Sequence, residues 1–175
     1  FFKQKTAYEI YQCDWSSDVC SSDLVADAKG RFALPLDMRK AVKASSGETR
    51  LCLTLHGKLP CAIGFGLSHK QWLEDQVVEM ERSARERGTD FDAEAERELR
   101  FGGIDEVNFD DGGRFFLSPA LRDLLGISDM IVFVGVSRHI QMWDPKTLLA
   151  SEGRSPQVRL AVERALAERG KGGGA

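Results

Sequence analysis

The chain contains few of the features that mark membrane proteins, metalloproteins and redox proteins. No uninterrupted apolar run approaches the roughly 20 residues that a membrane-spanning helix needs, so we expect no membrane partner. The four cysteines show neither CxxC spacing nor a nearby cluster of histidines, which argues against a zinc site and predicts buried or inert thiols. We therefore expect no metal and no cofactor, and a cytoplasmic protein. These cysteines are Cys13, Cys20, Cys52 and Cys61.

An excess of positive charge is also missing. The formal net charge of the 175 residues is -3, so general affinity for nucleic acid is not indicated and any basic surface must be local. The hydrophobic content of 42% is sufficient for one sizeable core or two small ones.

The first 24 residues differ in character from the rest. They hold two of the cysteines and two closely spaced Ser-Ser pairs, and no helix or strand periodicity continues from them downstream. The segment resembles a translated sequencing adapter and lacks the regions of a signal peptide. We expect residues 1–24 to be non-native and to have replaced a native first strand, with a genuine disordered extension as the alternative. Their two lysines and four acids account for two of the three net negative charges.

An internal repeat organises the remainder of the chain. Residues 27–39 align with residues 110–122 at an offset of 83, and six of the thirteen positions are identical. A match of this kind indicates two copies of one structural unit. The identical pairs are Asp27 and Asp110, Gly30 and Gly113, Arg31 and Arg114, Phe32 and Phe115, Leu34 and Leu117, and Arg39 and Arg122.

Each copy predicts a turn, a short strand, a helix and then a hairpin. In the first copy we expect a turn at 27–30, a strand at 31–34, a helix from Pro35 or Leu36 to Ser45-Ser46-Gly47, and strands at 50–55 and 61–65. In the second copy we expect a helix from Ser118-Pro119 to Gly126, strands at 130–136 and 139–143, and a further helix that begins at Asp144-Pro145.

A charged helical segment is predicted between the copies. Ser68 and Gln71 fit a capping box at its start, and Gly88 ends the first helix. The many Glu and Arg residues are typical of a solvated face with pairs four residues apart. The expected apolar face of the first helix consists of Leu73, Val77, Met80 and Ala84, and that of a second helix, ended by Gly102-Gly103, of Phe91, Ala95 and Leu99.

The C-terminal part predicts one more helix, from Ser155-Pro156 to Gly170, and then a flexible glycine-rich tail. Trp72, Phe101 and Trp143 are expected mostly in the core, and some of these aromatic residues between subunits. The resulting domain organisation is a first unit at 25–68, a helical linker at 69–103, a second unit at 104–147, and a C-terminal helix and tail at 148–175.

The repeated motif Asp-x-x-x-Arg is the strongest chemical feature. On a turn that leads into a strand, the carboxylate can accept backbone N–H bonds while glycine adopts a positive φ, and the arginine is then held at a fixed place. One interpretation is an ion pair that only stabilises the turn, worth about 0–1 kcal/mol at a surface. The other is a binding site, because residues 27–43 carry five basic groups against two acids. Such a patch suits phosphate, and a fixed arginine can read guanine.

The two motifs in this order resemble the MraZ family of bacterial transcriptional regulators. The resemblance is carried by Asp27-Ala28-Lys29-Gly30-Arg31 with Leu34-Pro35, by Asp110 to Arg114 with Pro119 and Leu121-Arg122, and by Val134 to Arg138 and Met142-Trp143-Asp144. It implies an α+β fold of two tandem SpoVT-AbrB-like, swapped-hairpin (double-psi-barrel-like) halves with intervening and C-terminal helices. It also implies a homo-oligomeric ring in the nucleoid, bound to short G-rich direct repeats in double-stranded DNA. The regulated genes would be a division and cell-wall cluster, usually repressed.

Residue roles follow from the resemblance position by position. Arg31 and Lys29 match as principal DNA contacts, and Arg39 as a further phosphate contact. Arg114 matches the second motif, but residues 110–123 carry three acids against two arginines, so DNA contact and a structural or subunit-interface ion pair both remain open. Ser118 replaces a proline more usual in the family, which a helix N-cap tolerates. The residues expected to shape the turns are Asp27, Gly30, Asp110 and Gly113.

Two other classes of function are alternatives to a DNA-binding regulator. An enzyme would need a nucleophile and a base, and the candidates are Cys52 or Cys61 with His56. The sequence shows no third residue to orient them, no phosphate loop and no metal-ligand spacing. We therefore expect no enzyme and no small-molecule substrate. The second alternative is an oligomeric, antitoxin-like module that uses the same fold to bind a protein, since fold alone does not determine function.

Overall fold

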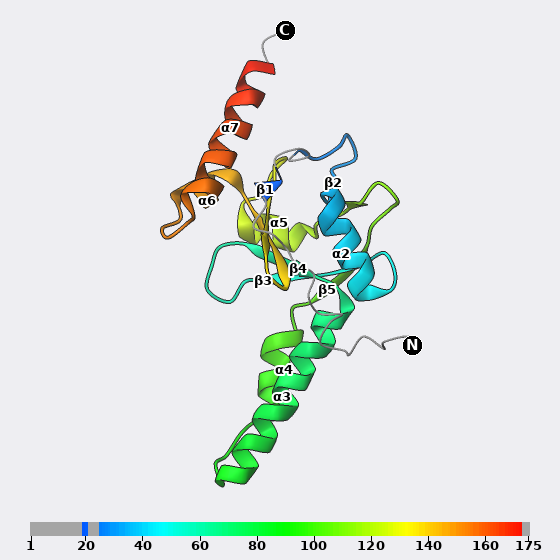
Figure 1. Cartoon of the computed structure of the whole chain (residues 1–175), viewed down its shortest axis with the longest axis vertical. Helices are drawn as coiled ribbons and strands as arrows, with labels where there is room; N and C mark the ends of the chain where they lie inside the picture. The colour runs from blue at the N-terminus through cyan, green and yellow to red at the C-terminus, as the bar shows by residue number, and fades with distance from the viewer. Residues whose placement is uncertain (1–18, 21–24, 173–175) are drawn as a thin grey trace, which may run out of the picture.

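The two repeats build one antiparallel sheet of six strands in a mixed α+β structure (Figure 1). The computed structural model describes residues 19–20 and 25–172. The strands follow the order β1-β7-β8-β4-β3-β5, and a second, two-stranded sheet pairs β2 with β6. The elements are β1 (Val19–Cys20), β2 (Phe32–Ala33), α2 (Leu36–Ser46), β3 (Arg50–Leu55), β4 (Ala62–Phe65), α3 (Leu67–Arg87), α4 (Ala93–Phe101), β5 (Asp105–Asn108), β6 (Arg114–Phe115), α5 (Pro119–Leu125), β7 (Val132–Val136), β8 (His139–Trp143), α6 (Pro145–Ala150) and α7 (Pro156–Gly172).

Each of the two edge strands of the sheet pairs with a strand from the other half of the chain. The hairpins β3–β4 and β7–β8 lie at the centre of the sheet and pair through β4 and β8. At one edge β5, which opens the second repeat, pairs with β3 of the first; at the other edge β1 pairs with β7 of the second. The sequence predicted neither β1 nor β5. The backbone of β1 belongs to the segment 1–24, whose non-native origin stays a prediction.

The pairing of β2 with β6 brings the repeated motifs themselves together. Phe32 lies opposite Phe115 in the register, with ring centroids 6.5 Å apart. Equivalent residues of both repeats then fill a single core on one side of the large sheet, and all eight are at most 7% exposed. They are Phe32 and Phe115, Leu34 and Leu117, Met38 and Leu121, and Val42 and Leu125. The apolar residues of the two repeats therefore form one sizeable core rather than one small core each.

A smaller cluster covers part of the opposite face of the sheet. Helices α6 and α7 pack there against alternate residues of β7 and β8, and Trp143, predicted in the core, is fully buried among them. Cys52 and Cys61 are free and buried, as predicted for these thiols. Cys13 lies outside the described residues.

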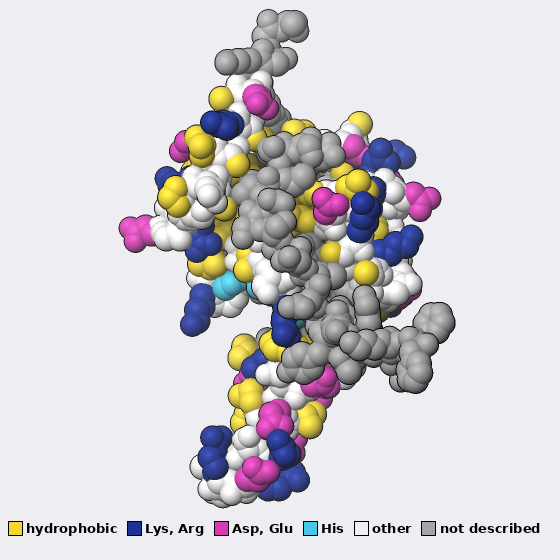
Figure 2. All heavy atoms as spheres, viewed as in Figure 1, with side chains coloured by type: hydrophobic (Ala, Val, Ile, Leu, Met, Phe, Trp, Pro, Cys, Tyr) yellow, Lys and Arg dark blue, Asp and Glu magenta, His cyan; other side chains and the backbone are white. Residues whose placement is uncertain are grey.

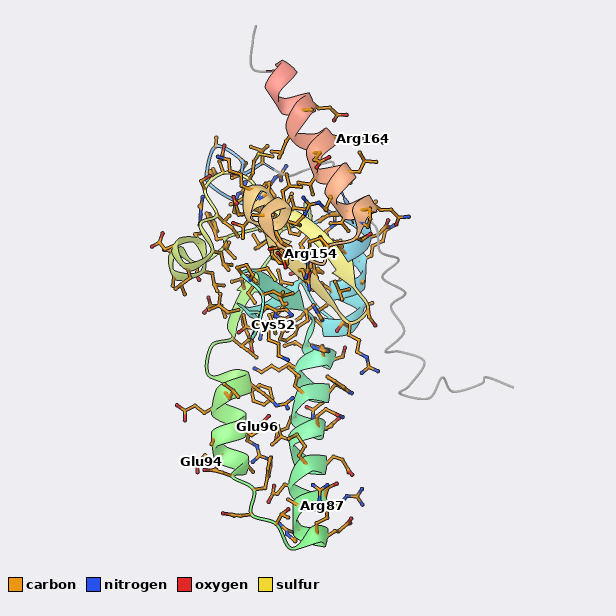
Figure 3. All side chains as sticks on the ribbon, turned by 90° about the vertical axis from the view of Figure 1, so that its left-hand side faces the viewer. Cys52, Arg87, Glu94, Glu96, Arg154 and Arg164 are labelled. Atoms are coloured by element: carbon orange, nitrogen blue, oxygen red, sulfur yellow. The ribbon has the colours of Figure 1, made fainter. Side chains whose placement is uncertain are left out.

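Helices α3 and α4 lie side by side and extend away from the sheet (Figures 1 and 3). The predicted capping box is wrong: Gly66 is the N-cap of α3, Ser68 contacts Ser45 instead, and Gln71 donates a hydrogen bond to Asp75. A Cβ at Gly66 would collide with the Ser45 side chain, because the start of α3 packs closely on the end of α2.

The predicted apolar faces of this hairpin are only partly correct. Val77 and Ala84 are buried on α3, but Met80 is 38% exposed. On α4 the prediction is wrong, because Leu99 is 81% exposed and Ala95 is also exposed. Trp72 and Phe101 are only half-buried at the base of this hairpin.

Most helix ends agree with the sequence. Gly47, Gly88 and Gly126 adopt the left-handed conformation after α2, α3 and α5, and Ser118 and Asp144 cap α5 and α6 with their side chains. Helix α7 continues to Gly172 rather than ending at Gly170, and the predicted tail beyond it lies outside the described residues. Among the described residues, no helix combines the length and apolar character needed to cross a membrane.

Neighbouring phenylalanines test the shared core. Phe115 is 1% exposed, so Phe115→Ala should lower the free energy of unfolding by about 3–5 kcal/mol through lost burial and a residual cavity. Phe116 is 57% exposed, and Phe116→Ala should change it by only about 0.5 kcal/mol. Urea denaturation of both variants gives the comparison, and equal losses would contradict the assignment of Phe115 to a shared core.

Candidate nucleic-acid interface

The two Asp-x-x-x-Arg motifs form the same turn. In each, the aspartate Oδ1 accepts a hydrogen bond from the arginine backbone N–H at 2.9 Å, for Asp27 with Arg31 and for Asp110 with Arg114. A glycine with φ of 77° in the first turn and 79° in the second follows the aspartate by three residues. A residue with a side chain is strained at such angles, which explains why both repeats place Gly30 and Gly113 there. The four predicted motif-shaping residues are therefore found in the predicted geometry.

Pairing of β2 with β6 brings the two motif arginines into one ionic cluster. The Arg31 Nε and Nη2 atoms bind Asp27 Oδ2 at 2.9 and 2.7 Å, and its Nη1 lies 3.3 Å from Asp110 Oδ2 in the other repeat. Arg114 Nη1 lies 3.6 Å from that same oxygen. The ion pairs that stabilise the turn also determine where the Arg31 guanidinium points. The same contacts can therefore stabilise the turn and position an arginine for binding.

Both aspartates are held in the ionised form. Hydrogen bonds from the Arg31 backbone and side chain lower the pKa of Asp27 from 3.8 to about 2. The backbone N–H of Arg114 lowers the pKa of Asp110, and the charges of Arg114 and Arg31 act in the same direction. At neutral pH the cluster therefore contains two carboxylates and two guanidinium groups, so its local charge is balanced rather than strongly basic.

Arg39, predicted as a phosphate contact, crosses from the first repeat to the second. Its Nη1 donates to the carbonyl oxygen of Asp111 at 2.7 Å, and its Cδ would lie 2.9 Å from a Cβ placed on Gly113. Gly113 therefore also provides close approach for this side chain. Arg39 remains partly exposed beside the second turn.

The equivalent residue of the second repeat, Arg122, was not proposed as a site residue. Its guanidinium carbon lies 5.4 Å from the ring centroid of Phe32, and it donates to the carbonyl oxygens of Ile127 and Ser128. The identity of Arg39 and Arg122 at the repeat offset was the signal that could have identified this cross-repeat position. The contacts of Arg122 give it a structural role.

Lys29 is exposed at the tip of the first turn. It borders a groove of about 870 Å³ between that turn, β5 and the start of α5. Apolar Phe116 and Ile127 line the groove together with acids such as Asp105. Figure 2 shows Lys and Arg side chains interspersed with Asp and Glu on the side of the molecule that carries β2 and α2. The charge of this surface is thus mixed rather than uniformly basic.

The geometry argues against the enzyme alternative. Burial raises the pKa of Cys52 to about 11 and that of Cys61 to about 12, so both thiols are protonated at neutral pH and are poor nucleophiles. The His56 Nδ1 atom accepts hydrogen bonds from the backbone N–H groups of Lys58 and Leu59, which occupies the atom a base would use. The described residues contain no group of three or more potential metal ligands.

The ionised Asp27 should make stability depend on pH at the acidic end. Because its folded pKa of about 2 lies below 3.8, its stabilising effect is present above about pH 4 and is lost as the pH falls toward 2. Asp27→Asn should therefore have a lower free energy of unfolding than the unaltered chain at neutral pH. This difference, the gap, should narrow below pH 4, and urea unfolding of both proteins across this pH range measures it. Asp37→Asn, at a carboxylate that is 96% exposed, is the control and should show little gap at any pH. A gap for Asp27→Asn that stays constant down to pH 2 would contradict the prediction.

Comparison with known proteins agrees with this geometry. The family model described as "MraZ protein, putative antitoxin-like" matches residues 100–151, which include the second turn, α5 and the β7–β8 hairpin. The chain is 33% identical over 145 residues to the transcriptional regulator MraZ of Thermomicrobium roseum, covering 78% of this chain and 92% of that protein. It is 31% identical over 134 residues to that of Bordetella pertussis, covering 75% and 85%.

The similarity to these regulators covers most of the chain. A third relative, the transcriptional regulator MraZ of Acidovorax sp. strain JS42, is 28% identical over 140 residues, which cover 80% of this chain and 91% of that protein. Because the match spans 80% of the chain, it includes the helical hairpin and the second motif. With two turn motifs of the same geometry and this similarity over most of its length, the chain belongs to the MraZ family.

Proposed function

We propose that this protein is a sequence-specific DNA-binding transcriptional regulator. The observation that carries the proposal is the cluster at the β2–β6 pair, where Arg31 and Arg114 of two separate repeats lie on one surface with Lys29 exposed beside them. Relatives named as transcriptional regulators support it.

The proposed DNA contacts are of two kinds: contacts to bases, which read the sequence, and contacts to phosphates, which position the protein on the DNA. Arg31 is held by two bonds to Asp27, so its guanidinium fork is oriented before DNA arrives and can donate to guanine O6 and N7 in the major groove. Lys29 and Arg39 carry their charges beside the two turns and suit phosphate contacts, which determine register and orientation rather than sequence. Arg114 is 49% exposed and is assigned as the second-repeat contact.

We infer that the two halves are swapped-hairpin AbrB-like units joined in one chain. The support is the exchange of β1 and β5 between the halves and the pairing of β2 with β6. Such units present one binding surface per chain, with few phosphate contacts and therefore modest affinity. We propose a homo-oligomeric ring that places several surfaces on spaced repeats, which makes later contacts intramolecular and raises avidity.

The proposed target is DNA with short G-rich direct repeats, upstream of a gene cluster for division and cell-wall synthesis that the protein represses in the nucleoid. The residue types agree with this preference, because the oriented side chain is an arginine and arginine pairs best with guanine.

An antitoxin-like module that binds a protein is the second candidate. Its support is the description of the matching family model and three exposed apolar side chains, those of Leu99, Phe116 and Leu124, which are 81%, 57% and 69% exposed. Exposed apolar side chains are a feature of protein-binding surfaces when they are contiguous, and Phe116 lines the groove beside Lys29.

Arg31→Ala tests the regulator directly. Fluorescence anisotropy should show that the unaltered chain prefers G-rich direct-repeat DNA over scrambled DNA of equal length and binds less tightly as salt rises. Arg31→Ala should lose about 1–3 kcal/mol of this preference, because one bidentate base contact is removed. Arg87→Ala is the matched control, since Arg87 lies at the far end of the α3–α4 hairpin (Figure 3). Equal binding to both DNAs that Arg31→Ala does not change would favour the protein-binding candidate.

The ring predicts a dependence of affinity on the number of repeats. Light scattering should give a mass that is several times the 19.4 kDa of one chain. Duplexes with several correctly spaced repeats should bind about 100-fold or more tightly than those with one repeat, through effective concentration. A monomer in solution, or affinity that rises only in proportion to the number of sites, would contradict the ring.

A further inference from the structure

Arg31 is shared by two carboxylates that hold it differently. One oxygen of Asp27 in its own turn, Oδ2, accepts from both the Nε and Nη2 atoms at 2.9 and 2.7 Å, within the usual length of a charged hydrogen bond. Asp110, from the other repeat, reaches only Nη1, at 3.3 Å, which is beyond the usual length of a charged hydrogen bond. The first contact therefore orients the guanidinium, while the second only occupies its remaining edge.

The same Asp110 oxygen also faces the second arginine. Arg114 Nη1 lies 3.6 Å from Asp110 Oδ2, and for Arg114 no other ion pair is found within the described part of the chain. Asp110 is 39% exposed and Arg114 is 49% exposed, so solvent and a ligand can reach this oxygen. One accessible carboxylate thus stands between the two arginines that the proposed function assigns to DNA.

We propose that Asp110 is an internal competitor for the DNA acceptor atoms that Arg31 and Arg114 would bind. The inference rests on the proposed function. Guanine O6 and N7 at Arg31, and a phosphate oxygen at Arg114, are hydrogen-bond acceptors as the carboxylate oxygen is, so DNA must displace Asp110 to use the free edge of Arg31. Asp27 stays bound and keeps the guanidinium oriented during the exchange. Asp27 is thus a positioning residue, and Asp110 lowers affinity for repeat and scrambled DNA alike, because the phosphate contact of Arg114 does not depend on sequence.

The two aspartates occupy equivalent places in the sequence repeat but have different tasks. Both accept the arginine backbone N–H at 2.9 Å and so support their turns equally. Only Asp110 bonds to the arginines of both repeats among the ion pairs of the described residues. Substitutions at the two positions should therefore change DNA binding in opposite directions.

The salt dependence of binding provides an independent signature. When an arginine that is free of an acid contacts phosphate, the DNA releases a condensed counterion. When the Asp110 carboxylate stays beside the arginines, its negative charge lowers the net positive charge that meets the DNA, so fewer counterions are released. Removing the Asp110 charge should thus steepen the fall of log affinity with log salt by about one unit.

The test compares Asp110→Asn with Asp111→Asn in the full chain. The asparagine Oδ1 can still accept the Arg114 N–H, so the turn is retained while the charge is lost. Asp111→Asn removes the same charge one residue away at an exposed side chain and keeps the carbonyl oxygen that Arg39 binds. Asp110→Ser, whose hydroxyl also supports a turn but does not reach the guanidinium groups, serves if Asp110→Asn folds poorly.

Fluorescence anisotropy on direct-repeat and scrambled duplexes, between about 50 and about 200 mM salt, measures the outcome. We expect Asp110→Asn to bind both duplexes about five-fold more tightly than Asp111→Asn, the size of one exposed ion pair, with the steeper salt slope. Asp27→Asn should bind less tightly than the unaltered chain.

Different results would contradict the Asp110 competitor and the DNA-binding regulator. If the unaltered chain prefers repeat DNA but Asp110→Asn binds no more tightly than Asp111→Asn, the competitor is overturned and the regulator stands. If neither the unaltered chain nor any variant binds DNA, both are overturned.

Discussion

The antiparallel pairing of β2 with β6 is the contact on which the other features of this protein depend. It is only two residues long in each strand, yet it places Phe32 against Phe115 and merges the apolar residues of both repeats into one core. It also places the turn before β2 beside the turn before β6, so the ionic cluster exists only because the strands pair. Stability and the candidate binding surface therefore have the same origin.

Within that surface, charge is balanced rather than accumulated. The carboxylates that shape the turns through backbone hydrogen bonds also neutralise the arginines beside them, and their pKa values are lowered as a consequence. A slightly acidic protein can in this way carry arginines that are oriented but only partly available. The proposed function and the proposed competition both follow from this arrangement, since a fixed guanidinium gains geometric specificity while a shared carboxylate limits its general attraction to phosphate.

Local chemistry made much of the fold predictable. Gly47, Gly88 and Gly126 mark helix ends, because glycine adopts the left-handed backbone conformation with little strain. Ser118 and Asp144 cap helices with their own side chains. Prediction failed where a distant segment decides the outcome. Ser68 could cap a helix by its sequence, but α3 packs so closely on α2 that Gly66 takes that position. Leu99 suggested a buried face on α4 and is instead exposed.

The sequence by itself determined the repeat, the Asp-Gly-Arg turns and most helix ends, because each depends on contacts within a few residues or on a similarity that the chain displays directly. The tertiary structure alone decided that β5 pairs with β3 across the repeats, that Arg31 reaches Asp110, and that Arg39 and Arg122 lie over the turns of the opposite repeat. These contacts join residues roughly 50 to 90 positions apart in the chain. No local pattern encodes such distances, and they are established only when burial of the common core selects one register for both halves.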